Sequence, residues 1–167
     1  MKNIALIDSE SINSSTSTGV IFSLGGILLS PELEQLDSFE LFCRNKPGHV
    51  LDPYSMWVNK GFHRMMKSNN SSLSMWYEFH KIVKKWQGEN GCIWGTYNGH
   101  SFDFPFIEKE NYRALLPIYI LKQNGNEAAD FLPFVRASKI FFPNSFKTKK
   151  TLKGNDSFKL TDLAEVN

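Results

Sequence analysis

The sequence predicts an α/β fold, in which a mixed sheet is flanked by helices. Three observations support this prediction: three strand-like segments open the chain, one strongly periodic helix comes next, and a further apolar strand precedes two helical patterns. The expected order is strand, strand, strand, helix, strand, helix, helix. We expect a single domain over residues 1–167, since no internal repeat or linker is visible and this length can bury a core.

The first three strands are expected to form an antiparallel meander. Residues 4–7 are a continuous apolar run that ends at Asp8, which is typical of a strand buried on both faces. Residues 20–29 form the second strand, and the pair Gly25–Gly26 indicates a bulge or the close approach of another backbone. Residues 38–43 alternate between polar and apolar and form the third. Short turns between the three segments favour antiparallel pairing.

Residues 72–87 form the clearest helix. Apolar side chains recur there at three- and four-residue spacing, Ser72 or Ser74 can cap its start, and Gly88 stops it. Residues 92–98 then form another predicted buried strand.

An aspartate followed by a proline marks the start of two later helices. Asp103 with Pro105 predicts a helix running towards Leu116, and Asp130 with Pro133 predicts one to about Ile140. A basic stretch then leads to a last helical pattern, which begins near Leu160.

Composition and charge exclude several classes of protein. The hydrophobic fraction of 41% and the aromatic fraction of 14% indicate a packed globular protein. A net charge of +2 means that a polyanion would have to be held by a local basic region. No apolar run has the length of a membrane helix and the N-terminus does not resemble a signal peptide, so we expect a cytoplasmic protein without a membrane partner. Cys43 and Cys92 are expected to be reduced. The sequence has no glycine-rich phosphate-binding loop, so we expect no organic cofactor.

Two carboxylates stand one residue apart after the first apolar run. Side chains two apart on a strand point to the same face, so Asp8 and Glu10 can converge on one point. Ionised carboxylates that close repel each other unless a cation lies between them, and oxygen-rich clusters suit Mg²⁺ or Mn²⁺. An acid at the end of a neighbouring strand would complete the ligand set, and Asp103 follows the strand at 92–98. Each acid also has a plain structural explanation, since Asp8 and Glu10 can be turn residues and Asp103 a helix cap.

The combination of motifs resembles the DEDD (DnaQ-like) superfamily of 3′→5′ exonucleases. Asp8-Ser9-Glu10 resembles its first motif and is followed by a strand of the form I-x-x-x-G at residues 21–25, while residues 98–103 (NGHSFD) resemble the second motif. Residues 130–137 (DFLPFVRA) and 157–164 (SFKLTDLA) are similar to segments of the exonuclease I branch. The resemblance covers nearly the whole chain and implies a ribonuclease H-like fold.

The resemblance also implies an activity and its residues. Asp8, Glu10 and Asp103 would be catalytic and would bind two divalent ions, Mg²⁺ or Mn²⁺, for cleavage of single-stranded DNA from its 3′ end. The substrate would be met by six further residues: Ser9, Ser11, Ile12, Phe62, Asn98 and Phe102. Phe62 lies in the segment corresponding to the family's H-G-I loop and could pack on a base, or it could be an ordinary aromatic of the core or surface.

The third motif of the superfamily, which supplies a histidine base and a fourth acid, has no counterpart here. None of the four histidines is followed by an aspartate at the H-x(4)-D spacing. We expect a fold that is incomplete at its C-terminus, either as the N-terminal fragment of a longer exonuclease with impaired activity or as a natural inactive form. His100 could replace the missing base, although a polar turn residue needs no catalytic role.

Two other functions stay open at this point. The chain could be a catalytically inactive nucleic-acid-binding module of the same fold, or a 3′→5′ exoribonuclease. A basic stretch could attract the phosphates of a strand or be a solvated loop. Its lysines are Lys147, Lys149, Lys150, Lys153 and Lys159.

Overall fold

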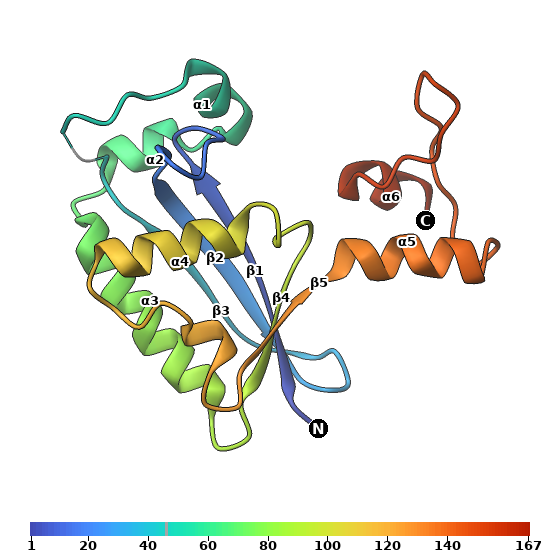
Figure 1. Cartoon of the computed structure of the whole chain (residues 1–167), viewed down its shortest axis with the longest axis horizontal. Coiled ribbons are helices and arrows are strands. Elements are labelled where there is room, and N and C mark those ends of the chain that lie inside the picture. Colours follow the sequence, from blue (N-terminus) through green and yellow to red (C-terminus); the bar gives the residue numbers. More distant parts are fainter. Residues whose placement is uncertain (46) are drawn as a thin grey trace. The chain divides into compact units, whose positions relative to one another are not determined.

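The computed structural model describes residues 1–45 and 47–167, which form two compact units. The first unit, residues 1–129, contains nearly the whole of a five-stranded sheet and the helices that pack on it (Figure 1). The second, residues 130–167, is helical. No helix in the described residues is both long enough and apolar enough to cross a bilayer.

The sheet has the order β3-β2-β1-β4-β5 and is mixed, as the sequence predicts. β1 pairs antiparallel with β2 and parallel with β4, while β2 and β3 are antiparallel. The three-stranded meander is thus confirmed, together with a parallel neighbour for the first strand. The strands are β1 (Asn3–Ser11), β2 (Ile21–Leu29), β3 (Gln35–Phe42), β4 (Cys92–Thr96) and β5 (Glu127–Asp130).

β1 differs from its prediction in length and in burial. The strand does not end at Asp8 but continues to Ser11, because its ladder with β2 runs on through both acids. One face, which includes Ala5 and Ile7, is buried, and the opposite face is only half-buried before it opens at Asp8. The glycine pair of β2 marks the close approach of a side chain rather than of a backbone: a Cβ on Gly26 would lie 2.6 Å from the ring of Phe39.

An aromatic core holds the long helix α3 (Ser72–Gln87) to the sheet. Phe79 and Trp86 of α3 contact the ring of Phe39 on β3, with centroids 5.9 and 5.2 Å apart. Trp86 also stacks on Trp94 of β4 at 5.7 Å. The helix has the predicted bounds, but its N-cap is Ser71 rather than Ser72 or Ser74.

The remaining elements of the first unit are short, apart from α4 (Asp103–Arg113). α4 begins where predicted and ends at Arg113, before Leu116. Sequence patterns did not predict the helices α1 (Pro53–Asn59) and α2 (Phe62–Lys67), the 3₁₀ turn η1 (Ile120–Lys122) or the strand β5. Figure 1 shows α1 and α2 beyond the C-terminal end of β1.

The second unit consists of α5 (Phe131–Phe141), α6 (Leu160–Val166) and the basic stretch between them. Asp130 caps α5 as predicted, since its side chain accepts a hydrogen bond from the N–H of Leu132. Lys149 pairs with Glu165, and Lys150 with Asp156 at 2.9 Å. Because two of the five lysines are neutralised within the unit, these two are less available to phosphates than the sequence suggests.

Candidate active site

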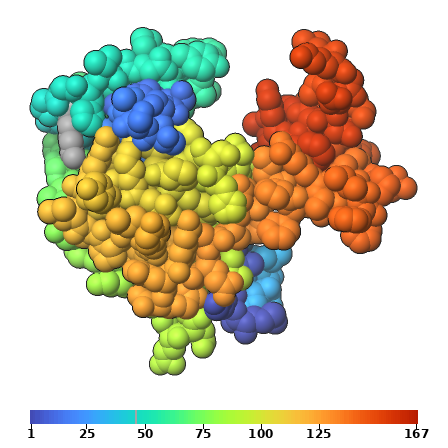
Figure 2. All heavy atoms as spheres, viewed as in Figure 1, coloured from blue at the N-terminus to red at the C-terminus, as the bar shows by residue number. Residues whose placement is uncertain are grey.

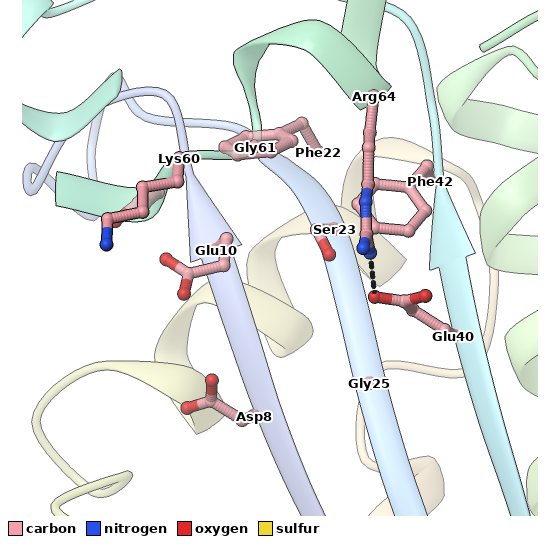
Figure 3. Close-up of a pocket in the computed structure, with 11 residues that line it drawn as sticks. Asp8, Glu10, Phe22, Ser23, Gly25, Glu40, Phe42, Lys60, Gly61 and Arg64 are labelled. Carbon is pink, nitrogen blue, oxygen red and sulfur yellow. Dashed lines mark hydrogen bonds and ion pairs between the residues drawn. The ribbon is translucent and has the colours of Figure 1, made fainter. Parts of the chain in front are cut away.

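A cavity of about 340 Å³ opens beside the end of β1. Figure 3 shows Asp8 and Glu10 on β1 at one side, with Lys60 near Glu10 and the side chains of α2 and β3 opposite. The lining residues therefore come from elements far apart in sequence. They are Asp8, Glu10, Phe22, Ser23, Gly25, Glu40, Phe42, Asn59, Lys60, Gly61 and Arg64.

The alternation of β1 directs Asp8 and Glu10 to the same face of the sheet, as predicted. Both line the cavity, whereas Ser9 between them is buried on the other face. Asp8 is exposed and Glu10 is half-buried. Within the described residues the Glu10 carboxylate has no hydrogen bond or ion pair, so its charge is not compensated locally.

Asp103 is brought to β1 by two hydrogen bonds from Ser9. Its Oδ1 accepts one from the backbone N–H at 3.1 Å and one from the hydroxyl Oγ at 2.6 Å. The partner pairs of β1 and β4 end at Leu6 and Gly95, so Ser9 lies beyond this ladder and Asp103 satisfies its N–H instead. Asp103 is therefore not the N-cap that the sequence suggested but the first residue of α4, with a buried carboxylate directed at β1.

Burial is the main cause of a raised pKa at all three carboxyl groups. It raises the pKa of Glu10 to about 7, with repulsion from Asp8 and Asp103 adding to the rise. It raises the pKa of Asp103 to about 6 in spite of the hydrogen bonds from Ser9. The pKa of Asp8 is also raised, although this side chain is exposed at the cavity. Because Glu10 is repelled by both other acids, the three groups form one electrostatic cluster.

The chemistry of this cluster fits a hard divalent cation. Carboxylates are the oxygen donors that Mg²⁺ and Mn²⁺ prefer, and a cation would relieve the repulsion among these three acids. Among residues 1–45 and 47–167, however, no three acidic, histidine or cysteine side chains are grouped closely enough to hold one ion as they stand. The three carboxylates are therefore suitable ligands for such a cation in donor type and in charge. The Asp103 carboxylate, however, is hydrogen-bonded to Ser9 and is not turned towards a position shared with Asp8 and Glu10.

A basic and aromatic wall faces the acids, and sequence patterns did not predict it. Lys60 has a left-handed backbone, with φ 50°, at the end of α1. Arg64 of α2 pairs with Glu40 of β3 and lies over the ring of Phe42, 5.3 Å from its centroid. A possible signal was the absence of any acid between residues 53 and 77.

The loop that follows β1 is fixed by α4. Lys109 donates to the carbonyl of Gly19, and Arg113 donates to the carbonyls of Gly19 and Ser17. Both cations also contact Glu110, which is 1% exposed, at 3.6 and 3.0 Å. The loop beside the acids is therefore anchored by a buried charge cluster.

The structure does not bring all predicted substrate residues to the cavity. The side chain of Ile12 is fully buried in the core, and the hydroxyl of Ser11 is buried and donates to the carbonyl of Asn13. Ser9 is directed at Asp103. The contacts of these three residues with a nucleotide stay predictions. Backbone atoms would have to make those contacts, because the side chains are buried.

The other predicted residues surround the site without lining the cavity. Phe62 is exposed at the start of α2, and Asn98 is exposed with φ 68° in the turn after β4. Phe102 is half-buried, with its ring 4.7 Å from that of Phe106. His100 is exposed in the same turn, with its ring 5.6 Å from that of Phe104, and its role as a base is still a prediction.

Comparison with solved structures identifies the fold. The whole chain matches E. coli exonuclease I in complex with a dT13 oligonucleotide, with a TM-score of 0.91 and 16% sequence identity. A complex of E. coli exonuclease I with a 5cy-dA13 oligonucleotide gives a TM-score of 0.90, and a product-bound exonuclease I gives 0.91, both at 16% identity. The chain spans 36%, 36% and 38% of these proteins. No family model matches the sequence, and no curated protein matches it. The ribonuclease H-like fold implied by the sequence resemblance is thus confirmed.

Proposed function

We propose that this chain carries the acidic site of a metal-dependent 3′→5′ exonuclease that acts on single-stranded DNA. The observation that carries the proposal is the cluster of Asp8, Glu10 and Asp103. Burial raises the pKa of all three, and repulsion between the acids adds to the rise at Glu10 and Asp103. The fold supports it, because proteins of this fold include exonuclease I bound to single-stranded oligonucleotides. The expected products, nucleoside 5′-monophosphates, follow from the sequence resemblance.

Each acid has a distinct role in this proposal. Asp8 and Glu10 would hold Mg²⁺ or Mn²⁺ in the cavity, and Asp103 would join them from the start of α4. Bound divalent ions supply an activated water and stabilise the leaving oxygen of a phosphodiester. Ser9 orients the Asp103 carboxylate through its N–H and hydroxyl groups.

The cavity would receive one nucleotide of the strand. Its volume of about 340 Å³ is at the lower end of the range for small-molecule sites, which suits a single nucleotide better than a duplex. The ammonium group of Lys60, which lies near Glu10 (Figure 3), would attract a phosphate, and the rings of Phe22 and Phe42 offer apolar walls to a sugar or base.

Turnover by residues 1–167 alone is expected to be slow. A histidine base and a fourth acid, which the resemblance implies, have no counterpart in these residues. Metal binding should be weakened for the same reason, since fewer charged ligands share the ions.

The proposal is tested with a 5′-labelled single-stranded oligonucleotide and the purified chain. Stepwise shortening from the 3′ end should require Mg²⁺ or Mn²⁺ and should vanish in Asp8→Ala, while the exposed acid variant Glu34→Ala should behave as wild type. Shortening that persists in Asp8→Ala or in excess chelator would overturn the proposal. Cleavage at ordinary exonuclease rates would show that the missing motif is not needed.

A second candidate is an inactive nucleic-acid-binding module of the same fold. It is favoured by the lack of a three-ligand metal group in the described residues. Oligonucleotide binding that is indifferent to chelator and to Asp103→Ala, without any shortening, would support it. Repeating the assay with RNA of the same sequence separates a deoxyribonuclease from an exoribonuclease, because only RNA carries the 2′-hydroxyl.

A further inference from the structure

The short helices α1 and α2 expose large apolar side chains to solvent. Tyr54 is 71% exposed, Trp57 is 75% exposed and Phe62 is 46% exposed. The rings of Tyr54 and Trp57 lie next to each other, with centroids 6.2 Å apart. We call the pair Tyr54 and Trp57 the α1–α2 aromatic face, and Phe62 follows it at the start of α2. Exposed aromatics grouped in this way mark a binding surface more often than scattered ones do.

This face is not needed for the packing of the two helices. α1 is anchored in the core by Met56 and α2 by Met65, which is fully buried. The loop before α1 holds this helix in place through backbone atoms, because the N–H of Asp52 donates to the carbonyl of Ile12. The aromatic rings are therefore free to serve a ligand.

The charge around the face suits a polyanion. Residues 53–77 contain no aspartate or glutamate, but they contain Lys60, Arg64 and Lys67. Arg64 is already paired with Glu40, whereas within residues 1–45 and 47–167 the exposed Lys60 and Lys67 form no ion pair. Exposed aromatic rings together with lysines on one segment are the composition that single-stranded nucleic acid prefers.

The segment that carries the face also reaches the acidic site. Lys60 and Gly61, which join α1 to α2, line the same cavity as Asp8 and Glu10. The side-chain amide of Asn59 donates to the carbonyl of Ser11 at 3.0 Å, directly after the acids of β1. Figure 2 shows the teal surface of this segment beside the blue segment that follows β1.

We propose that the α1–α2 aromatic face binds the bases of a single strand next to the nucleotide held in the cavity. Tyr54 and Trp57 would stack on successive bases, and Lys60 and Lys67 would contact the phosphates between them. This inference rests on the proposed function, because it takes the cavity as the site of the terminal nucleotide. Such stacking tolerates any sequence, since every base has a flat aromatic surface.

Tryptophan fluorescence tests the proposal directly. Of the four tryptophans, Trp57 alone is exposed, while Trp76, Trp86 and Trp94 are at most 4% exposed. A short oligothymidylate added in excess EDTA, which prevents metal-dependent cleavage, should quench the solvent-accessible emission. The quench should disappear in Trp57→Phe.

Affinity measured by anisotropy of a labelled oligonucleotide then separates stacking from folding. Trp57→Ala and Tyr54→Ala should each weaken binding about five- to 150-fold, which is the range for loss of one stacked base. Trp57→Phe keeps a ring and should retain most of the affinity. Tyr112→Ala removes an exposed ring from α4 and serves as the matched control, with affinity unchanged.

Two results would overturn the proposal. One is an oligonucleotide that binds without quenching Trp57 and with equal affinity for Trp57→Ala and Tyr112→Ala. The other is Trp57 emission that is shielded from solvent before any oligonucleotide is added, at a high protein concentration where sedimentation shows a dimer. That result would assign the face to a second copy of the chain. Binding through the face by a protein that cleaves nothing would refute the nuclease proposal and leave this one standing.

Discussion

Asp103→Asn should stabilise the metal-free protein at alkaline pH and not at acidic pH. The substitution keeps the shape of the side chain and an oxygen that can accept from Ser9, but it removes a buried negative charge. Because the pKa of Asp103 is raised in the folded state, the native protein binds more protons than the unfolded chain between about pH 4 and pH 6. Wild-type stability therefore falls as the pH rises through that window.

The magnitude follows from the rise in the pKa of Asp103. A rise from 3.8 to about 6, at ~1.4 kcal/mol per pH unit, corresponds to about 3 kcal/mol of native-state cost at pH 8. Asp103→Asn should remove that cost, so its gain in free energy of unfolding should be up to about 3 kcal/mol larger at pH 8 than at pH 4. Part of the rise comes from repulsion by Asp8, which Asp103→Asn also removes.

Urea denaturation in EDTA, followed by tryptophan fluorescence, measures this difference within the first unit, because all four tryptophans lie there. Asp37→Asn is a control of opposite sign: hydrogen bonds from Lys85 and Trp86 lower the pKa of Asp37 to about 2, so its loss should destabilise above pH 4. Equal effects of Asp103→Asn at pH 4 and pH 8 would refute the claim that this carboxylate bears an uncompensated charge.

Two further substitutions probe how the site is supported. Gly26→Ala should lower the free energy of unfolding by about 1–3 kcal/mol, since its Cβ would lie 2.6 Å from the packed ring of Phe39. Gly25→Ala should be neutral, because its Cβ would make only an ordinary contact, 3.9 Å from the carbonyl oxygen of Phe39. Equal losses for the two variants in urea would contradict the packing argument. Glu110→Gln should cost about 3 kcal/mol, because Lys109 and Arg113 lose their buried partner. Glu108→Gln, which breaks a more exposed pair with Lys122, should cost less than about 1 kcal/mol, and a similar cost for both variants would argue against a buried anchor.

Local patterns predicted the long elements of the fold and the acids of the site. The helix at 72–87 was predictable because its apolar spacing persists over 16 residues, and its bounds are confirmed. The spacing of Asp8 and Glu10 predicted their common face, since strand alternation depends only on the backbone. Asp103 was placed near them by the expected adjacency of two strands, which the pairing of β1 with β4 confirms.

Features that depend on tertiary contacts could not be predicted in the same way. The predicted first strand was too short, because polar residues within a strand resemble a loop in the sequence. In the structure these residues remain paired with β2, where one face of the strand opens to a cavity. α1 and α2 have 7 and 6 residues, too few for a helical period to be visible, although Asp52 before Pro53 was an available start signal. β5 has only four residues, and it is extended because it is hydrogen-bonded to β4 at the edge of the sheet.

The role of Asp103 shows a limit of the same kind. A helix cap and an acid directed at a neighbouring strand have the same sequence signature, and only the tertiary structure shows that the Asp103 carboxylate accepts from Ser9. The cavity wall formed by Glu40, Lys60 and Arg64 joins β3 to the end of α1 and to α2, which no sequence spacing relates.

The central claim is that three carboxylates from β1 and α4 share divalent cations, and Mn²⁺ binding tests it most directly. Electron paramagnetic resonance of free Mn²⁺, titrated with protein at pH 8, gives the affinity without any need for turnover. We predict saturable binding that weakens at least about tenfold in each of Asp8→Asn, Glu10→Gln and Asp103→Asn, as expected when a charged ligand is lost. Binding that is unchanged when all three acids are replaced would contradict the claim.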